Sequence, residues 1–355
     1  MPPPAPFVVL AKNAPKSPMD LALPLPAITH AARLIAPLAR QTPLLTAAAL
    51  DAQAGARLLL KAENLQTGGS FKIRGATHAL AQLSPAARAR GVAAFSSGNH
   101  AIAVALAAQH FGIRAVIVMP ADAPATKRAR TAQAGAEIVL YDRVTGDREA
   151  IAAELAARDG LTIIKPFDAR DTITGQATVG LELAAQAKAH GQALDGVAVC
   201  CGGGGLAAGV GAALATLSPA TKIWAVEPAA FDDTRQSVAA GERVQLDLRG
   251  RTSICDALLA PTPGKLTFAF NRRQLTGVAG VTDDEVRAAM RAAWEHLHLA
   301  LEPGGAVALA AALTGKLPLE GQTWGITLSG GNVDLPFFAA TVQPQSTPEA
   351  RRFSP

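Results

Sequence analysis

Short apolar segments rich in β-branched residues alternate along this chain with longer, alanine-rich segments that have helical spacing. The expected strands are residues 113–120, 136–141, 161–166, 194–201, 222–228 and 323–331. The expected helices between them include residues 124–135, 146–160, 174–191 and 204–217. This alternation predicts parallel sheets covered by helices. A chain of 355 residues is long for one such sheet, so we expect an α/β fold of two open, mostly parallel twisted sheets flanked by helices, with a cleft between them.

The composition of the chain indicates which partners and which cellular location to expect. No apolar run reaches the roughly 20 residues of a membrane-spanning helix, so no membrane partner is expected. Three cysteines, Cys200, Cys201 and Cys255, are too few for a disulfide framework and favour a reducing, cytoplasmic location. The formal net charge of +5 comes from scattered basic residues without interleaved aromatics, so no nucleic-acid partner is expected. The proline-rich residues 1–25 predict a flexible N-terminal extension.

A glycine loop follows the expected strand 194–201. The segment CCGGGGL joins that strand to the next expected helix through five residues: Gly202, Gly203 and, at the start of the helix, Gly204, Gly205 and Leu206. Glycines let the backbone approach an anion, and a helix N-terminus supplies unpaired N–H groups and a partial positive charge. A phosphate site is therefore favoured over a turn without a ligand. The same glycines, with Glu227 about 20 residues later, also match a dinucleotide-binding pattern, so an NAD-binding oxidoreductase remains an alternative.

Two further polar segments follow expected strands. SSGNHA, residues 96–101, precedes an apolar helix and holds more polar residues than helix capping requires. Its side chains suit a carboxylate at a helix N-terminus; they are Ser96, Ser97, Asn99 and His100. A histidine in such a position is more often structural than catalytic. SGGNVD, residues 329–334, begins with Ser329 at the end of the last expected strand, and alone it is an ordinary loop.

Lys72 lies in the segment GGSFKIRGA, residues 68–76, where a glycine-rich loop gives way to a helix. A solvated surface cation is the ordinary interpretation of a single lysine. A lysine that forms a Schiff base needs partial desolvation, which Phe71 and the small residues nearby would supply. The combination is more informative than its members. A Schiff-base lysine, a phosphate loop, a carboxylate loop and a strand-end hydroxyl are together what pyridoxal phosphate chemistry requires.

The whole set resembles a known family. SFKIRGA, SSGNHA, GGGGL, VEP, EPGGA and SGGNVD occur in the order found in fold-type II pyridoxal-phosphate enzymes, in the group of serine/threonine dehydratases, serine racemases and 3-hydroxyaspartate dehydratases. The resemblance covers about residues 30–340. It implies a tryptophan synthase β-like fold and a homodimer. It also implies a large cofactor-binding domain (26–87 and 169–345) and a small domain (88–168) that closes over the substrate.

The resemblance implies roles in cofactor binding. Lys72 would carry the cofactor and act as an acid/base, with Phe71 beside the cofactor ring. Asn99 would bond the 3′-oxygen of the ring, Ser329 would meet its pyridine nitrogen, and Glu302 would lie close to it. The glycine loop would bind the phosphate through its backbone N–H groups.

The resemblance also implies a substrate site. The residues that would frame the amino-acid α-carboxylate are Ser96, Ser97, Asn99 and His100. Ser97 would in addition be the acid/base on the face opposite Lys72. Arg148 stands at the start of an expected helix, where a cation is unfavourable. Its DRE segment resembles one found in serine racemases and 3-hydroxyaspartate dehydratases, which raises a second substrate carboxylate as an alternative to the ordinary and favoured interpretation, a solvated arginine.

VEPAAFDD, residues 226–233, resembles the divalent-cation site of the family. Glu227 and Asp233 would supply carboxylates, and Phe231 would supply its backbone carbonyl. Oxygen ligands of this kind suit Mg²⁺, Ca²⁺ or Mn²⁺. The alternative for Glu227 is a surface acid at the end of a strand.

We therefore expect a pyridoxal-phosphate-dependent dehydratase. It would convert a β-hydroxy-α-amino acid of the serine, threonine or 3-hydroxyaspartate type to a 2-oxo acid and ammonia. If Ser97 returns a proton to the opposite face before elimination, the outcome is racemisation, so a racemase on the same scaffold is the alternative. An NAD-binding oxidoreductase would leave Lys72, Asn99 and Ser329 without a role.

Overall fold

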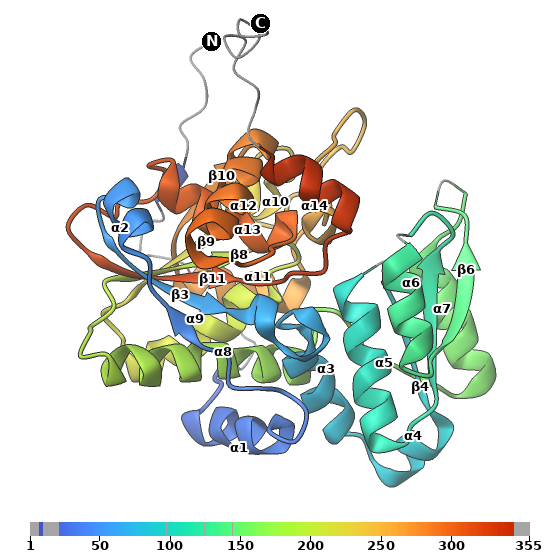
Figure 1. The fold of residues 1–355 in the computed structure, drawn as a ribbon. Helices are drawn as coiled ribbons and strands as arrows, with labels where there is room; N and C mark the ends of the chain where they lie inside the picture. Colours follow the sequence, from blue (N-terminus) through green and yellow to red (C-terminus); the bar gives the residue numbers. More distant parts are fainter. Residues whose placement is uncertain (1–6, 10–20, 97, 124, 144, 344–355) are drawn as a thin grey trace, which may run out of the picture.

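The computed structural model describes residues 7–9, 21–96, 98–123, 125–143 and 145–343. These residues form two β-sheets flanked by helices (Figure 1). Both sheets are mostly parallel, which confirms the α/β fold expected from the sequence. None of the helices in the described ranges combines the length and the apolar character needed to cross a membrane.

The larger sheet has seven strands within the described ranges, in the order β1-β10-β9-β8-β11-β3-β2. The strands from β10 to β3 are parallel to one another, and the edge strands β1 and β2 are antiparallel to their neighbours. Their bounds are β1 Phe7–Val9, β2 Leu44–Leu45, β3 Arg57–Ala62, β8 Gly196–Cys200, β9 Lys222–Pro228, β10 Leu275–Val281 and β11 Thr323–Leu328.

The smaller sheet is parallel throughout, in the order β6-β5-β4-β7, and stands beside the larger one (Figure 1). Its strands are β4 Val92–Phe95, β5 Ala115–Pro120, β6 Glu137–Tyr141 and β7 Thr162–Ile163. Its helices are α4 Pro85–Arg90, α5 Asn99–Phe111, α6 Ala125–Gln133 and α7 Arg148–Asp159. The strands all fall within residues 88–168, where a small domain is expected; the division into domains that move separately stays a prediction.

Helices cover both faces of the larger sheet. In Figure 1, α1 and α8 lie below the sheet, and α12, α13 and α14 lie above it. The α-helices of this part are α1 Leu25–Ile35, α2 Ala48–Ala54, α3 Lys72–Ala81, α8 Arg170–Ala189, α9 Gly205–Leu217, α10 Asp233–Ala240, α11 Lys265–Gln274, α12 Asp283–Leu297, α13 Pro303–Leu313 and α14 Leu335–Val342. Short 3₁₀ turns are η1 Glu63–Leu65, η2 Thr67–Gly69 and η3 Asp256–Leu258.

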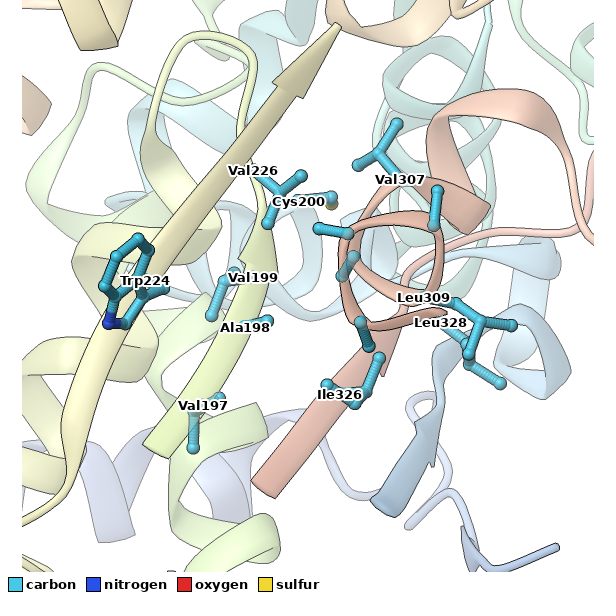
Figure 2. Close-up of a cluster of buried hydrophobic side chains, with 14 of the residues drawn as sticks. Val197, Ala198, Val199, Cys200, Trp224, Val226, Val307, Leu309, Ile326 and Leu328 are labelled. Carbon is cyan, nitrogen blue, oxygen red and sulfur yellow. The ribbon is translucent and has the colours of Figure 1, made fainter. Parts of the chain in front are cut away.

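The main core lies between the central strands and α13 (Figure 2). Side chains drawn there are Val197, Ala198, Val199 and Cys200 of β8, Trp224 and Val226 of β9, Ile326 and Leu328 of β11, and Val307 and Leu309 of α13. Strands that are buried on both faces have continuous apolar sequences, which explains why β8 and β11 were recognisable from the sequence. Close packing of this core fixes where the carboxyl ends of β8, β9 and β11 lie.

Two described parts of the expected N-terminal extension pack against the core. Phe7–Val9 forms β1, which pairs with β10, and the Phe7 ring meets the Trp224 ring edge to face with 5.5 Å between centroids. Leu21 and Leu23 are buried in a cluster with Ile28. These parts of the extension therefore contact the folded core, and the flexibility expected of residues 1–25 as a whole stays a prediction.

A buried network of charges holds the start of α3. Arg74 donates hydrogen bonds to Glu63 at 2.7 and 2.8 Å and to Glu182 at 2.6 and 2.8 Å. Lys61 donates to Glu182 at 2.6 Å. Burial opposes the charge of Glu63, yet the facing Arg74 and Lys61 keep the pKa of Glu63 below its ordinary value. The network joins β3, η1 and α8 to α3, and thereby sets where α3 begins.

We predict that Arg74→Met lowers the free energy of unfolding by about 3–5 kcal/mol, because it leaves the buried charge of Glu63 uncompensated. Chemical denaturation monitored by circular dichroism measures the change. The matched control is Arg57→Met, since Arg57 pairs with Asp51 at 2.7 Å but its side chain is 46% exposed; its loss is expected to cost less than about 1 kcal/mol. Equal small losses in both variants would contradict a stabilising role for the buried network.

Candidate active site

A cavity of about 210 Å³ lies where loops of the two sheets meet. Residues from the ends of β4, β8 and β11 and from the starts of α3, α5 and α9 form its walls, the usual place for ligands in parallel α/β folds. It is lined by the following residues singled out from the sequence: Phe71, Lys72, Ser96, Asn99, His100, Arg148, Gly202, Gly203, Gly204, Gly205, Leu206, Glu302 and Ser329. Ser97, the expected second acid/base, lies outside the described residues.

Lys72 is the first residue of α3, as expected from the loop-to-helix pattern. Its Nζ donates to the carbonyl of Pro166 at 2.8 Å and lies 5.1 Å from the centroid of the Phe71 ring. Burial lowers the pKa of Lys72 to about 8, with Cys200 and Glu302 acting in the opposite direction. A substantial fraction of this amine is therefore unprotonated near pH 8, which makes it a nucleophile and a base.

The end of β11 lies directly beside Lys72. The backbone N–H of Phe71 donates to the carbonyl of Ser329 at 3.2 Å. The Ser329 hydroxyl donates to the carbonyl of Gly304 at 3.4 Å. Cys200 also lines this part of the cavity, and burial raises the pKa of its thiol to about 11 against a hydrogen bond with Ser329. The thiol is thus neutral and unreactive; the sequence singled out Cys200 only in the cysteine count.

The glycine loop turns tightly at the start of α9. Gly204 has φ +90°, and a Cβ on Gly203 would lie 2.4 Å from the ring of Phe167. Thr267 Oγ1 donates to the Gly203 carbonyl at 2.6 Å, and Asn271 Nδ2 donates to the Gly204 carbonyl at 3.1 Å. Helix α11 therefore holds the loop through its carbonyl groups. The first N–H groups of α9 have no acceptor within the helix, and with the loop they fit an anion such as phosphate.

The carboxylate loop begins α5. Asn99 Nδ2 donates to Glu302 Oε1, and Asn99 Oδ1 accepts from Asn332 Nδ2 at 2.8 Å. His100 Nε2 donates to the carbonyl of Ile164 at 2.8 Å. Burial, reinforced by Lys72, lowers the pKa of His100 to about 3, so its ring is neutral. The Nδ1 atom is then a bare acceptor, and within the described ranges it is buried without a partner.

Arg148 lines the cavity from the start of α7. Its guanidinium carbon lies 5.7 Å from the centroid of the Phe95 ring. Arg143 also lines the cavity, which the sequence had not indicated, and it pairs with the exposed Asp122 at 3.0 Å. Two arginines therefore line the cavity, and Asp122 partly offsets the charge of one of them.

Ser96 Oγ accepts the N–H of Gly98 at 3.1 Å.

The expected cation ligands are not among the cavity residues. Glu227 ends β9, and its carboxylate accepts the backbone N–H groups of Thr234 and Arg235 at 3.0 Å each. Asp233 is fully buried, and within the part of the chain that the structure describes both its oxygens lack a hydrogen-bond partner. Burial raises the pKa of Asp233 to about 8, and burial together with Asp233 raises the pKa of Glu227. No group of three or more His, Cys, Asp or Glu residues that would hold a metal occurs among the described residues.

The sequence carried no signal for a charged cluster on the cavity wall. Lys127 Nζ lies 2.6 Å from Asp256 Oδ2 and 3.9 Å from Glu302 Oε2. Burial raises the pKa of Glu302 to about 7, with Lys127 acting in the opposite direction. Asp256 falls in residues 240–282, where the alternation of strands and helices breaks down. Lys127 falls in a basic helical segment, where it looks like any solvated lysine.

Comparison with known proteins identifies a family model and several relatives that match this chain. The family described as "Pyridoxal-phosphate dependent enzyme" matches residues 35–330. The chain is 42% identical to the L-threo-3-hydroxyaspartate ammonia-lyase of Saccharomyces cerevisiae over 302 residues, 85% of this chain and 91% of that protein. It is 38% identical to the serine racemase of Schizosaccharomyces pombe, over 88% of this chain and 95% of that protein. The structure superposes on the threonine deaminase of T.th. with a TM-score of 0.82 and 41% identity, covering 88% of this chain and 99% of the other.

We predict that, in protein freed of pyridoxal phosphate, Lys72 is methylated faster than exposed lysines on treatment with formaldehyde and a borane reductant at pH 8. A pKa of about 8 leaves about half of the amine unprotonated at that pH, against less than about 1% of an ordinary lysine. Peptide mass spectrometry measures the rate at each site, with the exposed Lys222 as the control. A rate at Lys72 no higher than that at Lys222 would contradict a reactive amine.

Proposed function

The chain belongs to the pyridoxal-phosphate-dependent enzymes of fold type II, in the group of serine/threonine dehydratases, serine racemases and 3-hydroxyaspartate ammonia-lyases, and we propose that it is an ammonia-lyase for 3-hydroxyaspartate. The net reaction would release oxaloacetate and ammonia, since the water lost in β-elimination is regained when the product hydrolyses. The observation that carries the proposal is a reactive amine, Lys72, in one cavity with a phosphate-type glycine loop and two arginines. The NAD-binding alternative is wrong, because the family match includes the glycine loop.

The residues present fit pyridoxal phosphate. The glycine loop at the N-terminus of α9 and the amine of Lys72 line the same cavity, and they suit its phosphate and its aldehyde. Lys72 would hold the cofactor covalently, and Asn99 and Ser329 would contact its ring. When bound, the cofactor supplies an electron-withdrawing ring that stabilises negative charge on the substrate α-carbon.

The protein's own residues would move the substrate proton and bind the substrate carboxylate. The amine of Lys72, with its pKa near 8, would remove the α-proton from the face that it occupies. The backbone N–H groups at the start of α5 would receive the α-carboxylate, and the neutral ring of His100 would add no second cation beside Lys72. Ser329 offers a neutral hydroxyl rather than a carboxylate, which favours elimination of the β-hydroxyl over transamination.

The arginines support a substrate with a second carboxylate. Arg148 and Arg143 both line the cavity, and a guanidinium can bind a carboxylate through two parallel hydrogen bonds. A methyl group, as in threonine, or the bare hydroxymethyl of serine would leave that charge unused. The relative from Saccharomyces cerevisiae is named for a substrate of this kind, which adds independent support.

Serine racemisation remains the second candidate, supported by the relative from Schizosaccharomyces pombe. It requires an acid/base on the face opposite Lys72. Ser97 is the residue proposed for that role, and it lies outside the described residues. A homodimer in the cytoplasm, as the family resemblance implies, is part of the same proposal.

We predict that Arg148→Met lowers kcat/KM for 3-hydroxyaspartate about tenfold to a hundredfold, because a charge-assisted pair with the second carboxylate is lost. Turnover of serine should be unchanged. Oxaloacetate and pyruvate release are measured on a panel of the hydroxyaspartate stereoisomers, serine and threonine, with chiral chromatography of the serine pool. Lys72→Ala serves as the inactive reference.

The matched control is Arg158→Met, because Arg158 lies on the same helix and pairs with Asp159 at 2.7 Å without lining the cavity. An equal effect of Arg148→Met on serine and hydroxyaspartate would contradict recognition of a second carboxylate. Wild-type protein that converts threonine or serine better than every hydroxyaspartate isomer would contradict the proposed substrate. Racemised serine without 2-oxo acid release would favour the second candidate.

We also propose that Glu227, Asp233 and the Phe231 carbonyl bind a divalent cation such as Mg²⁺, Ca²⁺ or Mn²⁺. The support is structural: two buried carboxylates lie close together, and neither oxygen of Asp233 has a hydrogen-bond partner among the described residues. A buried carboxylate that is left unpaired is costly, and a bound cation would offset that cost.

For this site we predict that EDTA lowers the melting temperature of the wild-type protein and that added Mg²⁺ or Mn²⁺ restores it, because a ligand bound only to the native state stabilises it. Asp233→Asn should remove the response to EDTA. Differential scanning calorimetry at equal cofactor occupancy makes the comparison. A wild-type melting temperature that EDTA leaves unchanged would contradict the binding of a cation at this site.

A further inference from the structure

Helix α6 of the smaller sheet contacts loops of the larger sheet at the cavity. Thr126 Oγ1 donates to Asp334 Oδ1, and Arg130 donates to Asn332 Oδ1. Both partners follow β11, about 200 residues away in the sequence. The helix is thus joined to the larger sheet by polar side chains that interact only when the two parts of the fold lie against each other.

Lys127, on the same helix, reaches further into the cavity. Only 6% of its surface is exposed, yet it pairs with Asp256 at 2.6 Å and lies 3.9 Å from Glu302. Burial alone would lower the pKa of Lys127, but Glu302, Asp256 and Asp334 raise it. The amine therefore stays charged, unlike Lys72, and it is not available as a base.

The charge of Lys127 faces a chain of hydrogen bonds that leads into the site. Glu302 Oε2 is buried without a hydrogen-bond partner in the described ranges, and Lys127 is the cation beside it. Glu302 Oε1 accepts from Asn99, and Asn99 accepts from Asn332 at 2.8 Å. Asn332 in turn accepts from Arg130. This hydrogen-bond chain begins and ends on α6. It contains Asn99, which the proposed function puts beside the cofactor, and Glu302, which the family resemblance implies lies close to the cofactor ring.

We propose that Lys127 is a positioning residue: by pairing with Asp256 and facing Glu302, it holds Glu302 and Asn99 in their working geometry when α6 docks over the cavity. Its effect on turnover rests on the proposed function, whereas its effect on the docking of α6 does not. A methionine in its place would fill similar space without compensating the buried carboxylate.

The charge of Lys127 also has a consequence for pH dependence. The charged and titratable groups facing Glu302 are Lys127 on α6, Asp256 on η3 and Lys72 on α3. Those facing Lys127 are Asp256, Glu302 and Asp334. Removing the cation disfavours the Glu302 carboxylate, so a titration that reports Glu302 moves to higher pH than about 7.

The test compares Lys127→Met and Lys127→Arg with Arg128→Met as the matched control. Arg128 is the next residue of α6 but lines a shallow groove with Ile138 and Leu140 instead of the cavity. Hydrogen–deuterium exchange of residues 125–133, with and without pyridoxal phosphate, reports the docking of α6. Kinetics on the best substrate of the panel report kcat, KM and the pH profile.

Lys127→Met should speed exchange in α6, lower kcat about tenfold to a hundredfold with a smaller change in KM, and move the acidic limb of the pH profile upward. Lys127→Arg should restore most of each property, and Arg128→Met should match the wild type. Asp256→Asn combined with Lys127→Met should be little worse than either single variant, because the two residues act as a pair.

The proposal is overturned if Lys127→Met lowers only the melting temperature while exchange in α6 and the pH profile remain those of the wild type. It is also overturned if Lys127→Arg is as impaired as Lys127→Met, or if the losses of Lys127→Met and Asp256→Asn simply add. Wild-type protein without turnover on the whole panel would refute the proposed function instead, and the exchange measurements would still decide whether Lys127 docks α6.

Discussion

The buried ion-pair network around Arg74 is the interaction on which the geometry of the cavity depends. Arg74 contacts Glu63 and Glu182 from the first turn of α3, two residues after Lys72. A guanidinium can satisfy two carboxylates at once through its fixed fork of donors. Because the three groups cannot be buried separately, α3 can begin at only one place relative to β3 and α8. Lys72 and the neighbouring end of β11 follow from that placement.

Desolvation then sets the chemical character of the cavity. Burial is the largest influence on the pKa of Lys72, His100, Cys200 and Glu302, and in each case it favours the neutral form. A base, a neutral acceptor and an unreactive thiol therefore coexist within one small cavity. Lys127 is the contrasting case, since its carboxylate partners outweigh burial and keep it charged. The division between a neutral and a charged lysine arises from their partners and not from their residue type.

The fold alone does not decide the reaction. Relatives named as ammonia-lyase, racemase and deaminase share this architecture at about 40% identity. Of the residues proposed to hold the cofactor, Lys72, Ser329 and the glycine loop come from the larger sheet and its helices, whereas Asn99 comes from α5 of the smaller sheet. The parts that would select the substrate, Arg148 and the loop before α5, come from the smaller sheet. Side chains of α6 contact the residues that follow β11, and these contacts hold the two sets against each other.

Local sequence signals determined a large part of this protein. The alternation of apolar and alanine-rich segments identified β5–β9, β11 and α6–α9. The glycine loop, Lys72, Asn99 and Ser329 were recognisable because they lie in short motifs that together resemble those of the family. The sequence alone did not reveal that β1 pairs with β10, or that Asp256, Thr267 and Asn271 support the site. Nor did it separate Lys127 from a surface lysine.

Those features depend on contacts between distant residues. Lys127 and Asp256 are 129 residues apart, and Asn99 and Asn332 are 233 apart. A side chain's burial and charged partners are properties of the packed chain, and no local period encodes them. For that reason the sequence determined which groups are present at the strand ends, whereas only the tertiary structure decided which of them are neutral, which are charged and which face one another.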